Sequence, residues 1–275
     1  MRTGLIIYRG CAGDRNARGI AGAQLVGNKL SSYLHQTPVF VGTPREPQRA
    51  TWDRELTFAR GDLRSLAAAL DGLLGAGNRV VTAMGRCAAG LATVPVIAIR
   101  RPDACVAWLD AHGDSNVPTS RPDAYLGGMV ITGAAGHWDT GLGGSLDLSN
   151  VVLVGSRDLD PDELELIAAG TLRHLPVGPD LPARLREAIA GRAVYVHLDC
   201  DVLDPGIVPT EYEVPGGLTL ADLRAVANVV AEHEVIGLEI AEFESQWSDG
   251  RQGSPGPLIE ALAPLLANPV ASPGS

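Results

Sequence analysis

The sequence predicts an α/β fold in which a mostly parallel central sheet lies between two layers of helices. Short, β-prone apolar runs recur along the 275 residues and alternate with segments of helical periodicity, as in βαβ units. The runs are almost continuously apolar, which is typical of strands covered on both faces. The predicted strands are residues 5–8, 39–41, 79–82, 106–109, 151–154, 194–196 and 235–238.

Two segments between these strands carry the clearest helical pattern, in which apolar residues share one face of a helix. The first stripe is Leu63, Leu66, Ala67 and Leu70, and the second is Leu220, Leu223, Val226 and Val230. Thr219, with Asp222 three residues later, predicts the start of the second helix through a capping box. We expect a single domain, residues 1–275, with a frayed polar tail at 268–275.

Composition and charge exclude several classes of function. Hydrophobic residues make up 45% and charged residues 20% of the chain, as in ordinary globular proteins. The formal net charge of −10 argues against nucleic acid as a partner. The longest apolar stretch, residues 87–99, is too short to cross a membrane. Four cysteines without paired spacing, and no signal peptide before the first strand, predict a cytoplasmic protein.

Acidic clusters follow two of the predicted strands. Asp110, His112 and Asp114 come after residues 106–109, and Asp199 and Asp201 come after residues 194–196. Alternate residues of an extended segment point the same way, and open α/β sheets bind ligands at the carboxyl ends of their strands. Four carboxylates and one imidazole exceed the needs of one divalent ion. These hard ligands favour two Mn²⁺ ions over a thiolate-rich zinc site.

Either cluster alone has a plainer explanation, because Asp-x-Asp pairs are common in solvated turns. Their repetition at the ends of two strands favours the metal centre. An EF-hand loop is a poor alternative, since no glutamate stands at its twelfth position and no helix leads into it.

Four motifs extend this pattern along the chain: Asp-Ala-His-Gly-Asp-Ser-Asn at 110–116, His-Leu-Asp-Cys-Asp-Val-Leu-Asp-Pro at 197–205, Pro-Gly-Gly-Leu at 215–218 and Glu-Ile-Ala-Glu at 239–242. In order and spacing they resemble the ureohydrolase family, which includes arginases and agmatinases. The resemblance spans most of the chain. It implies an arginase-type three-layer fold, a small guanidine substrate and two Mn²⁺ ions.

Carried over residue by residue, the resemblance implies a ligand set for both ions. Asp110 and Asp199 would bridge them, Asp114 would complete one site, and His112 and Asp201 would complete the other. A hydroxide held between the ions would attack the guanidine carbon, because two cations lower the pKa of a shared water and polarise its target.

The resemblance also implies substrate contacts. Glu242 would hold the guanidine group, with Glu239 nearby, and Glu242 and Asp114 are the predicted catalytic carboxylates. Asp160 would bind an α-amino group and Asn116 an α-carboxylate, while Asp160, which is followed by proline, is also a suitable start for a helix. Arg121 could add a charged contact, or it could be a solvated loop residue.

The first departure from the family pattern is Cys87. Residues 84–88 read Met-Gly-Arg-Cys-Ala where arginases have Gly-Gly-Asp-His-Ser, so a cysteine stands at the terminal ligand of the first metal. A thiolate can bind there as a softer, charged donor, which would make the site less strictly selective for manganese. The alternative is a buried structural thiol beside a weakly held or missing ion.

The second departure is Gly127, which stands where arginases have a proton-relaying histidine. Without that acid, release of a basic alkylamine from a guanidinium with a pKa above about 12 is difficult. An N-hydroxylated guanidine is less basic, and its hydroxyl could enter the space at Gly127. His137 could replace the missing acid, although a structural role beside Trp138 is the simpler interpretation.

With Cys87 and Gly127 at these positions, the chain resembles the family members that hydrolyse Nω-hydroxy-L-arginine in D-cycloserine biosynthesis, an antibiotic pathway. The expected products are L-ornithine and hydroxyurea. Two alternatives stay open: an arginase, agmatinase or guanidino-acid hydrolase that releases urea, and a metal-binding pseudoenzyme. The short carboxyl terminus is compatible with a monomer and does not exclude an oligomer.

Overall fold

The computed structural model describes residues 2–121 and 123–267, and within these ranges it contains one eight-stranded sheet in which all paired strands run parallel. The strand order is β2-β1-β3-β8-β7-β4-β5-β6. The strands are β1 (Arg2–Tyr8), β2 (Val39–Val41), β3 (Asn78–Ala83), β4 (Cys105–Leu109), β5 (Val151–Val154), β6 (Arg173–Leu175), β7 (Val194–Asp199) and β8 (Val235–Ala241). The tail expected to fray, 268–275, lies outside the described residues.

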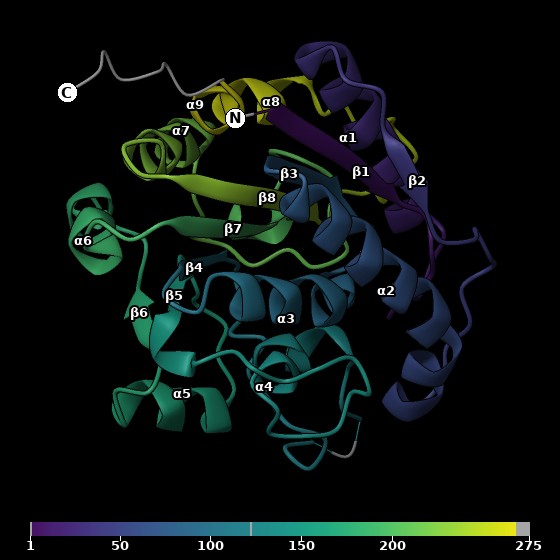
Figure 1. The fold of residues 1–275 in the computed structure, drawn as a ribbon, viewed down its shortest axis with the longest axis horizontal. Coiled ribbons are helices and arrows are strands. Elements are labelled where there is room, and N and C mark those ends of the chain that lie inside the picture. Colours follow the sequence, from purple (N-terminus) through teal and green to yellow (C-terminus); the bar gives the residue numbers. More distant parts are fainter. Residues whose placement is uncertain (1, 122, 268–275) are drawn as a thin grey trace.

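Helices cover both faces of the sheet (Figure 1). One face carries α1 (Arg18–Leu34), α6 (Leu181–Ile189), α7 (Leu220–Val230), α8 (Gly256–Ala261) and α9 (Ala263–Leu266). The other carries α2 (Trp52–Gly75), α3 (Gly90–Arg100), α4 (Val130–Ala134) and α5 (Pro161–Ala168). Short 3-10 turns lie at Cys87–Ala89, Gly127–Met129, Leu148–Asn150 and Cys200–Val202. The predicted three-layer α/β fold is confirmed.

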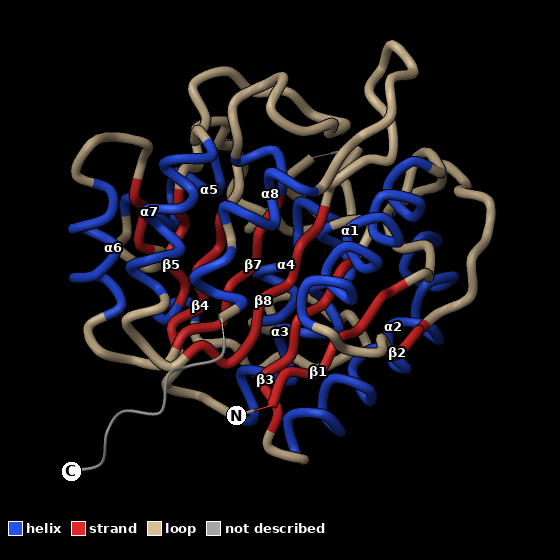
Figure 2. Tube along the Cα trace, turned by 90° about the horizontal axis from the view of Figure 1, so that it is seen from above, coloured by secondary structure: helices blue, strands red, loops and turns tan. Residues whose placement is uncertain are grey.

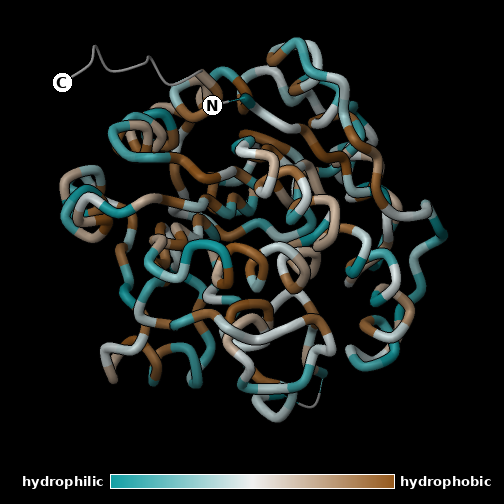
Figure 3. The backbone as a smooth tube through the Cα atoms, in the orientation of Figure 1, coloured by the Kyte–Doolittle hydropathy of each residue, from teal (hydrophilic) through white to brown (hydrophobic). Residues whose placement is uncertain are grey.

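Successive side chains of each strand point to opposite faces of the sheet, so the interior contains two hydrophobic cores. In β4, Ala107 and Leu109 pack into the core beneath α7, whereas Val106 and Trp108 pack into the core beneath α3. Figure 3 shows the hydrophobic residues concentrated along the central strands, with hydrophilic turns around them. None of the described helices is long and apolar enough to cross a membrane.

Both helical stripes face these cores. Leu63, Leu66 and Leu70 of α2 are fully buried, and Thr219 and Asp222 form the expected capping box at the start of α7. Strand β6 (Arg173–Leu175) is not among the strands predicted from the sequence. This edge strand has three residues and begins with an exposed arginine, so it has no continuous apolar run.

The strand order explains where a site can form. β3, β8, β7 and β4 are consecutive neighbours, so the segments that follow them emerge side by side at one edge of the sheet. Trp108 pairs with His197, and His197 pairs with Glu239, which keeps the carboxyl ends of β4, β7 and β8 level. Figure 2 shows long loops gathered at that edge.

Candidate metal centre

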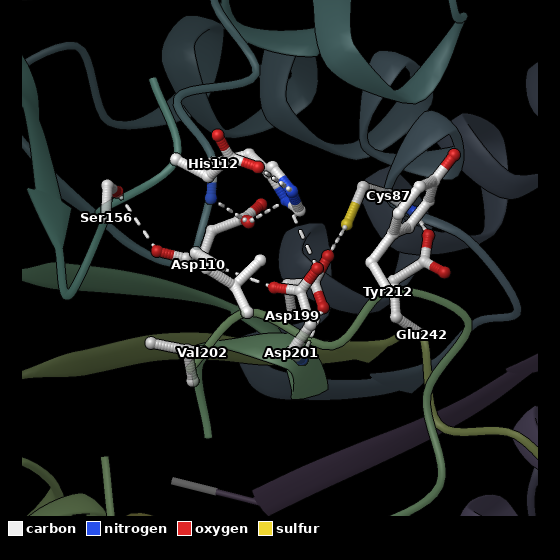
Figure 4. Close-up of polar contacts among 12 residues, drawn as sticks. Cys87, Asp110, His112, Ser156, Asp199, Asp201, Val202, Tyr212 and Glu242 are labelled. Carbon is white, nitrogen blue, oxygen red and sulfur yellow. Dashed lines mark hydrogen bonds and ion pairs between the residues drawn. The ribbon is translucent and has the colours of Figure 1, made fainter. Parts of the chain in front are cut away.

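Polar side chains from four neighbouring strands converge at this edge (Figure 4). Cys87 follows β3, Asp110 follows β4, Asp199 ends β7 and Glu242 follows β8. The Cys87 thiol donates to Asp199 Oδ2 over 3.0 Å. On the other side of the cluster, His112 Nδ1 lies 3.2 Å from Asp110 Oδ1 and 3.1 Å from a carboxylate oxygen of Asp201. The two acidic motifs therefore meet in space.

Three groups among the described residues bring possible ligand atoms within 4.8 Å of one another, which suits a metal ion. They are Cys87, Asp199 and Glu242; Asp110, His112 and Asp201; and Cys87, Asp110 and His197. Asp114 adds a buried carboxylate whose Oδ2 has no hydrogen-bond partner in the described structure. A buried acceptor without a donor is costly, and a cation would satisfy it.

The backbone is strained at two of these carboxylates. Asp114 has φ +44° and Glu242 has φ +63°, in the left-handed region that side chains other than glycine rarely adopt. The other two such residues in the described chain, His35 and Ala190, end helices, where this conformation is common. Strain away from a helix end concentrates at functional sites.

Burial, and after it charge repulsion, governs the electrostatics of the cluster. Burial and neighbouring carboxylates raise the pKa values of Asp114 and Asp199 well above their usual range, and the same causes raise the pKa of Asp201. Burial opposes ionisation of Asp110 too, but hydrogen bonds from His112 keep its pKa below the usual value. Burial lowers the pKa of His112, yet its bonds to two carboxylates raise that pKa to about 12. Divalent cations would relieve this repulsion.

Arg86 is a site residue that the sequence analysis missed. Its buried guanidinium pairs with Glu242 Oε2 at 2.5 Å and Glu244 Oε1 at 3.0 Å. It also pairs with Glu211 Oε2 at 2.8 Å and, more distantly, with Asp14 Oδ1 at 3.6 Å. Glu242 Oε1 accepts from the Cys87 N–H at 3.0 Å. Both Glu242 oxygens therefore already have donors from the protein.

A cavity of about 320 Å³ links the cluster to a second polar group. Cys87, Asp114, Asp199 and Glu242 are among the residues that line one part. The lining also includes Asn116, Arg121 and Asp160, of which the first two both contact Asp160. Asn116 Nδ2 donates to Asp160 Oδ2 over 2.9 Å, and Arg121 Nη1 donates to Asp160 Oδ1 over 3.1 Å. Asp160 also precedes α5 and donates its N–H to Glu163 at 2.9 Å, so it has a structural contact as well.

Comparison with known proteins gives this arrangement a family. A model described as the arginase family matches residues 44–253. The N(omega)-hydroxy-L-arginine amidinohydrolase of Streptomyces lavendulae is 35% identical over 270 residues, which cover 98% of this chain and 99% of that protein. The chain belongs to the arginase family. The expectation of a hydrolase from this family is confirmed.

A further relative and two solved structures are also similar to this chain. An arginase of Schizosaccharomyces pombe is 29% identical over 221 residues, 72% of this chain and 67% of that protein. The structure of Entamoeba histolytica arginase in complex with L-ornithine superposes with a TM-score of 0.84 at 18% identity and covers 97% of this chain and 99% of that chain. Proclavaminate amidino hydrolase of Streptomyces clavuligerus superposes with a TM-score of 0.72 at 21% identity, over 96% and 90% of the two chains. These structures show the arginase fold.

Around Gly127, the structure differs from what the family resemblance led us to expect. A Cβ atom on Gly127 would meet Tyr125 Cε1 at 2.5 Å, so an aromatic ring occupies space that we expected to be open. Burial and the nearby Glu242 carboxylate raise the pKa of Tyr125 well above its usual value. His137 is exposed and is not among the described residues that line the cavity, whereas Trp138 packs against Trp52.

Proposed function

We propose that this arginase-family protein is a binuclear-manganese amidinohydrolase that converts Nω-hydroxy-L-arginine to L-ornithine and hydroxyurea. The observation that carries the proposal is the cavity, which has a cysteine among its acidic residues and a tyrosine ring beside Gly127. The relative in Streptomyces lavendulae, named for this activity and matched over nearly the whole chain, supports the same substrate.

The residues present fit two divalent ions, as the orphaned Asp114 oxygen and the three ligand groups indicate. Asp110 and Asp199 would bridge the ions, Asp114 and Cys87 would complete one site, and His112 and Asp201 the other. Mostly oxygen donors favour manganese, and the single sulfur broadens the choice of metal. When bound, the ions would lower the pKa of a water molecule and polarise the guanidine carbon.

Glu242 would orient the reacting group. Each carboxylate oxygen has two acceptor positions, so Glu242 can accept a substrate N–H while it keeps Arg86 and the Cys87 N–H. The buried Arg86 already balances part of its charge. Glu242 should therefore favour a weakly basic hydroxyguanidine over a fully cationic guanidinium.

Hydrolysis must break the bond between the guanidine carbon and the chain nitrogen and deliver a proton to the departing amine. In the described part of the cavity, no imidazole lies next to Gly127; the ring beside it belongs to Tyr125. The raised pKa keeps the Tyr125 phenol protonated at neutral pH, so it can donate a hydrogen bond without relaying protons quickly. A less basic substrate reduces the demand for such a relay.

The amino-acid end of the substrate would meet Asn116, Arg121 and Asp160. Asp160 suits an α-ammonium group, and Asn116 and Arg121 suit an α-carboxylate. Asn116 and Arg121 both contact Asp160, and all three residues line the same cavity as the acidic cluster. Agmatine lacks a carboxylate and would leave Arg121 without a substrate partner, so we propose an α-amino acid substrate.

Replacing Asp160 by asparagine should raise KM for Nω-hydroxy-L-arginine about 10- to 100-fold, the effect of losing a charged hydrogen bond, and should change kcat much less. Steady-state kinetics measure both constants. Asp162→Asn is the matched control, because it removes the same charge from the first turn of α5 at an exposed position. Equal KM values for both variants would show that Asp160 does not bind the substrate.

The biological setting follows from the proposed products. Hydroxyurea would serve as a precursor in D-cycloserine biosynthesis, as the family resemblance implies. The cytoplasmic location stays a prediction, and the sequence left both a monomer and an oligomer open, which gel filtration of the metal-loaded protein would decide.

A further inference from the structure

A buried series of polar side chains contacts Cys87. The Cys87 sulfur is 3.1 Å from His197 Nε2, and His197 Nδ1 is 2.6 Å from Glu239 Oε1. All three side chains are almost completely buried. His197 belongs to the motif at 197–205 and Glu239 to the motif at 239–242, and their spacing alone indicates no role for either residue.

Glu239, at the end of this series, is held by two further hydrogen bonds. Glu239 Oε2 accepts from the Thr93 hydroxyl and from the Tyr195 hydroxyl, each at 2.6 Å. Both hydroxyl groups are buried. Because both carboxylate oxygens have donors, Glu239 cannot turn away from His197 without leaving buried polar groups unpaired.

The plane of the His197 ring is fixed as well. It stacks on the Trp108 ring with 3.5 Å between centroids and 3° between planes. Trp108 Nε1 donates to Asp110 Oδ2 over 3.1 Å, so the same stack contacts the acidic cluster. Nδ1 faces the Glu239 carboxylate, which leaves Nε2 directed at sulfur.

We propose that His197, held by Glu239, is a positioning residue that aims the Cys87 sulfur at the metal centre. A single side-chain torsion with three staggered positions places the sulfur of a cysteine, and here the sulfur lies between His197 Nε2 and Asp199 Oδ2. The contact between His197 Nε2 and the sulfur selects this rotamer. Partners of this kind behind metal ligands strongly affect metal affinity.

The inference rests on the proposed function for one point, that Cys87 binds metal. The test therefore uses the cobalt-loaded full-length protein, in which a cobalt–thiolate bond gives a charge-transfer absorption band in the near ultraviolet. Cys87→Ser should abolish the band, whereas Cys105→Ser, at a buried thiol within β4, should leave it unchanged.

His197→Phe keeps an aromatic ring against Trp108 and removes both ring nitrogens. It should weaken the band and raise the dissociation constant for Co²⁺ and Mn²⁺ about 10- to 100-fold. His197→Gln, whose amide can still donate to sulfur, should restore part of both. Glu239→Gln should reduce the absorption band and the metal affinity less than His197→Phe does, because Glu239 acts only through the His197 ring. Urea unfolding of the metal-free variants identifies any that fail to fold.

The outcomes separate the inference from the proposed function. If Cys87→Ser retains the band, Cys87 is not a ligand, and both its proposed place in the metal centre and the positioning role of His197 fail, whereas the proposed reaction is tested separately by turnover. If Cys87→Ser loses the band but His197→Phe retains wild-type absorption and affinity, only the positioning role is overturned. A direct bond from His197 Nε2 to metal in a structure of the loaded protein would also overturn it, because His197 would then be a ligand.

Discussion

Replacing Asp199 by asparagine is expected to lower turnover at least about 1000-fold and to lose at least one of two bound ions. Asp199 ends β7 and lies between the two halves of the cluster: its Oδ2 accepts from Cys87 and its Oδ1 from the Asp201 N–H. Under the proposed function it bridges both ions, and a neutral amide is a poor bridge. Metal stoichiometry and ornithine release measure the two effects.

In the metal-free protein, the same substitution should increase the free energy of unfolding. Burial and neighbouring carboxylates raise the pKa of Asp199, so its ionised form destabilises the metal-free fold at neutral pH. The Asp199→Asn variant should therefore resist urea better than the wild type in chelator at pH 7. The difference should shrink as the pH falls below about 4, where the unfolded carboxyl is also protonated.

Asp204→Asn is the matched control for Asp199. Asp204 belongs to the same motif but accepts from the Gly216 and Gly217 N–H groups, at 2.7 and 3.1 Å, and lies outside the ligand groups. Its substitution should cost at most about 1 kcal/mol of stability and no metal. An Asp199→Asn protein that keeps two ions and turnover near the wild-type rate would contradict the bridging role.

Arg86→Met is expected to destabilise the metal-free fold by about 3–5 kcal/mol, the cost of leaving buried charges without their partner. Glu242 and Glu244 are almost completely buried and both pair with Arg86. Asp14 is buried as well, and even with Arg86 nearby, burial raises its pKa to about 7. A loss of this size is a large part of the 5–15 kcal/mol typical of a folded domain, and urea unfolding in chelator measures it.

Arg101→Met provides the comparison for Arg86. Arg101 donates to both oxygens of Glu234, but both side chains are partly exposed, so the expected loss is about 1 kcal/mol or less. Similar losses for the two variants would mean that the Arg86 cluster contributes no more than a surface ion pair.

Much of the fold was readable from local patterns. A continuous apolar run marked β5 (Val151–Val154) correctly, because buried parallel strands need apolar side chains on both faces. The apolar run of β2 (Val39–Val41) also marked a strand, although this edge strand leaves Val39 and Phe40 exposed. The predicted strands were too short where polar residues continue a strand into the site, as at Asp199 in β7 and Glu239 in β8. Edge strand β6 lacked the pattern altogether, since it has little apolar surface to bury.

The acidic cluster was predictable for a related reason. Asp110 and His112 follow β4 and Asp201 follows β7, so the ends of two paired strands bring them together. They lie in a loop and in a 3-10 turn, however, and not in the extended segments that their spacing predicted. Arg86 and His197 gain their roles from contacts with residues more than 100 positions away in the chain. A lone arginine or histidine carries no local signal of such a contact. The cysteine at position 87, where arginases have histidine, was the sign in the sequence that the residues around that position also differ.

The most direct test of the proposed function is steady-state turnover of the manganese-loaded protein on Nω-hydroxy-L-arginine and on L-arginine side by side, with ornithine detected from both. We predict a kcat/KM at least about 100-fold higher for the hydroxylated substrate, because a missing general acid typically costs that much with a basic leaving group. Hydroxyurea should form in equal amount to ornithine. Comparable kcat/KM values for the two substrates, with urea released from L-arginine, would contradict the proposal and make the protein an ordinary arginase.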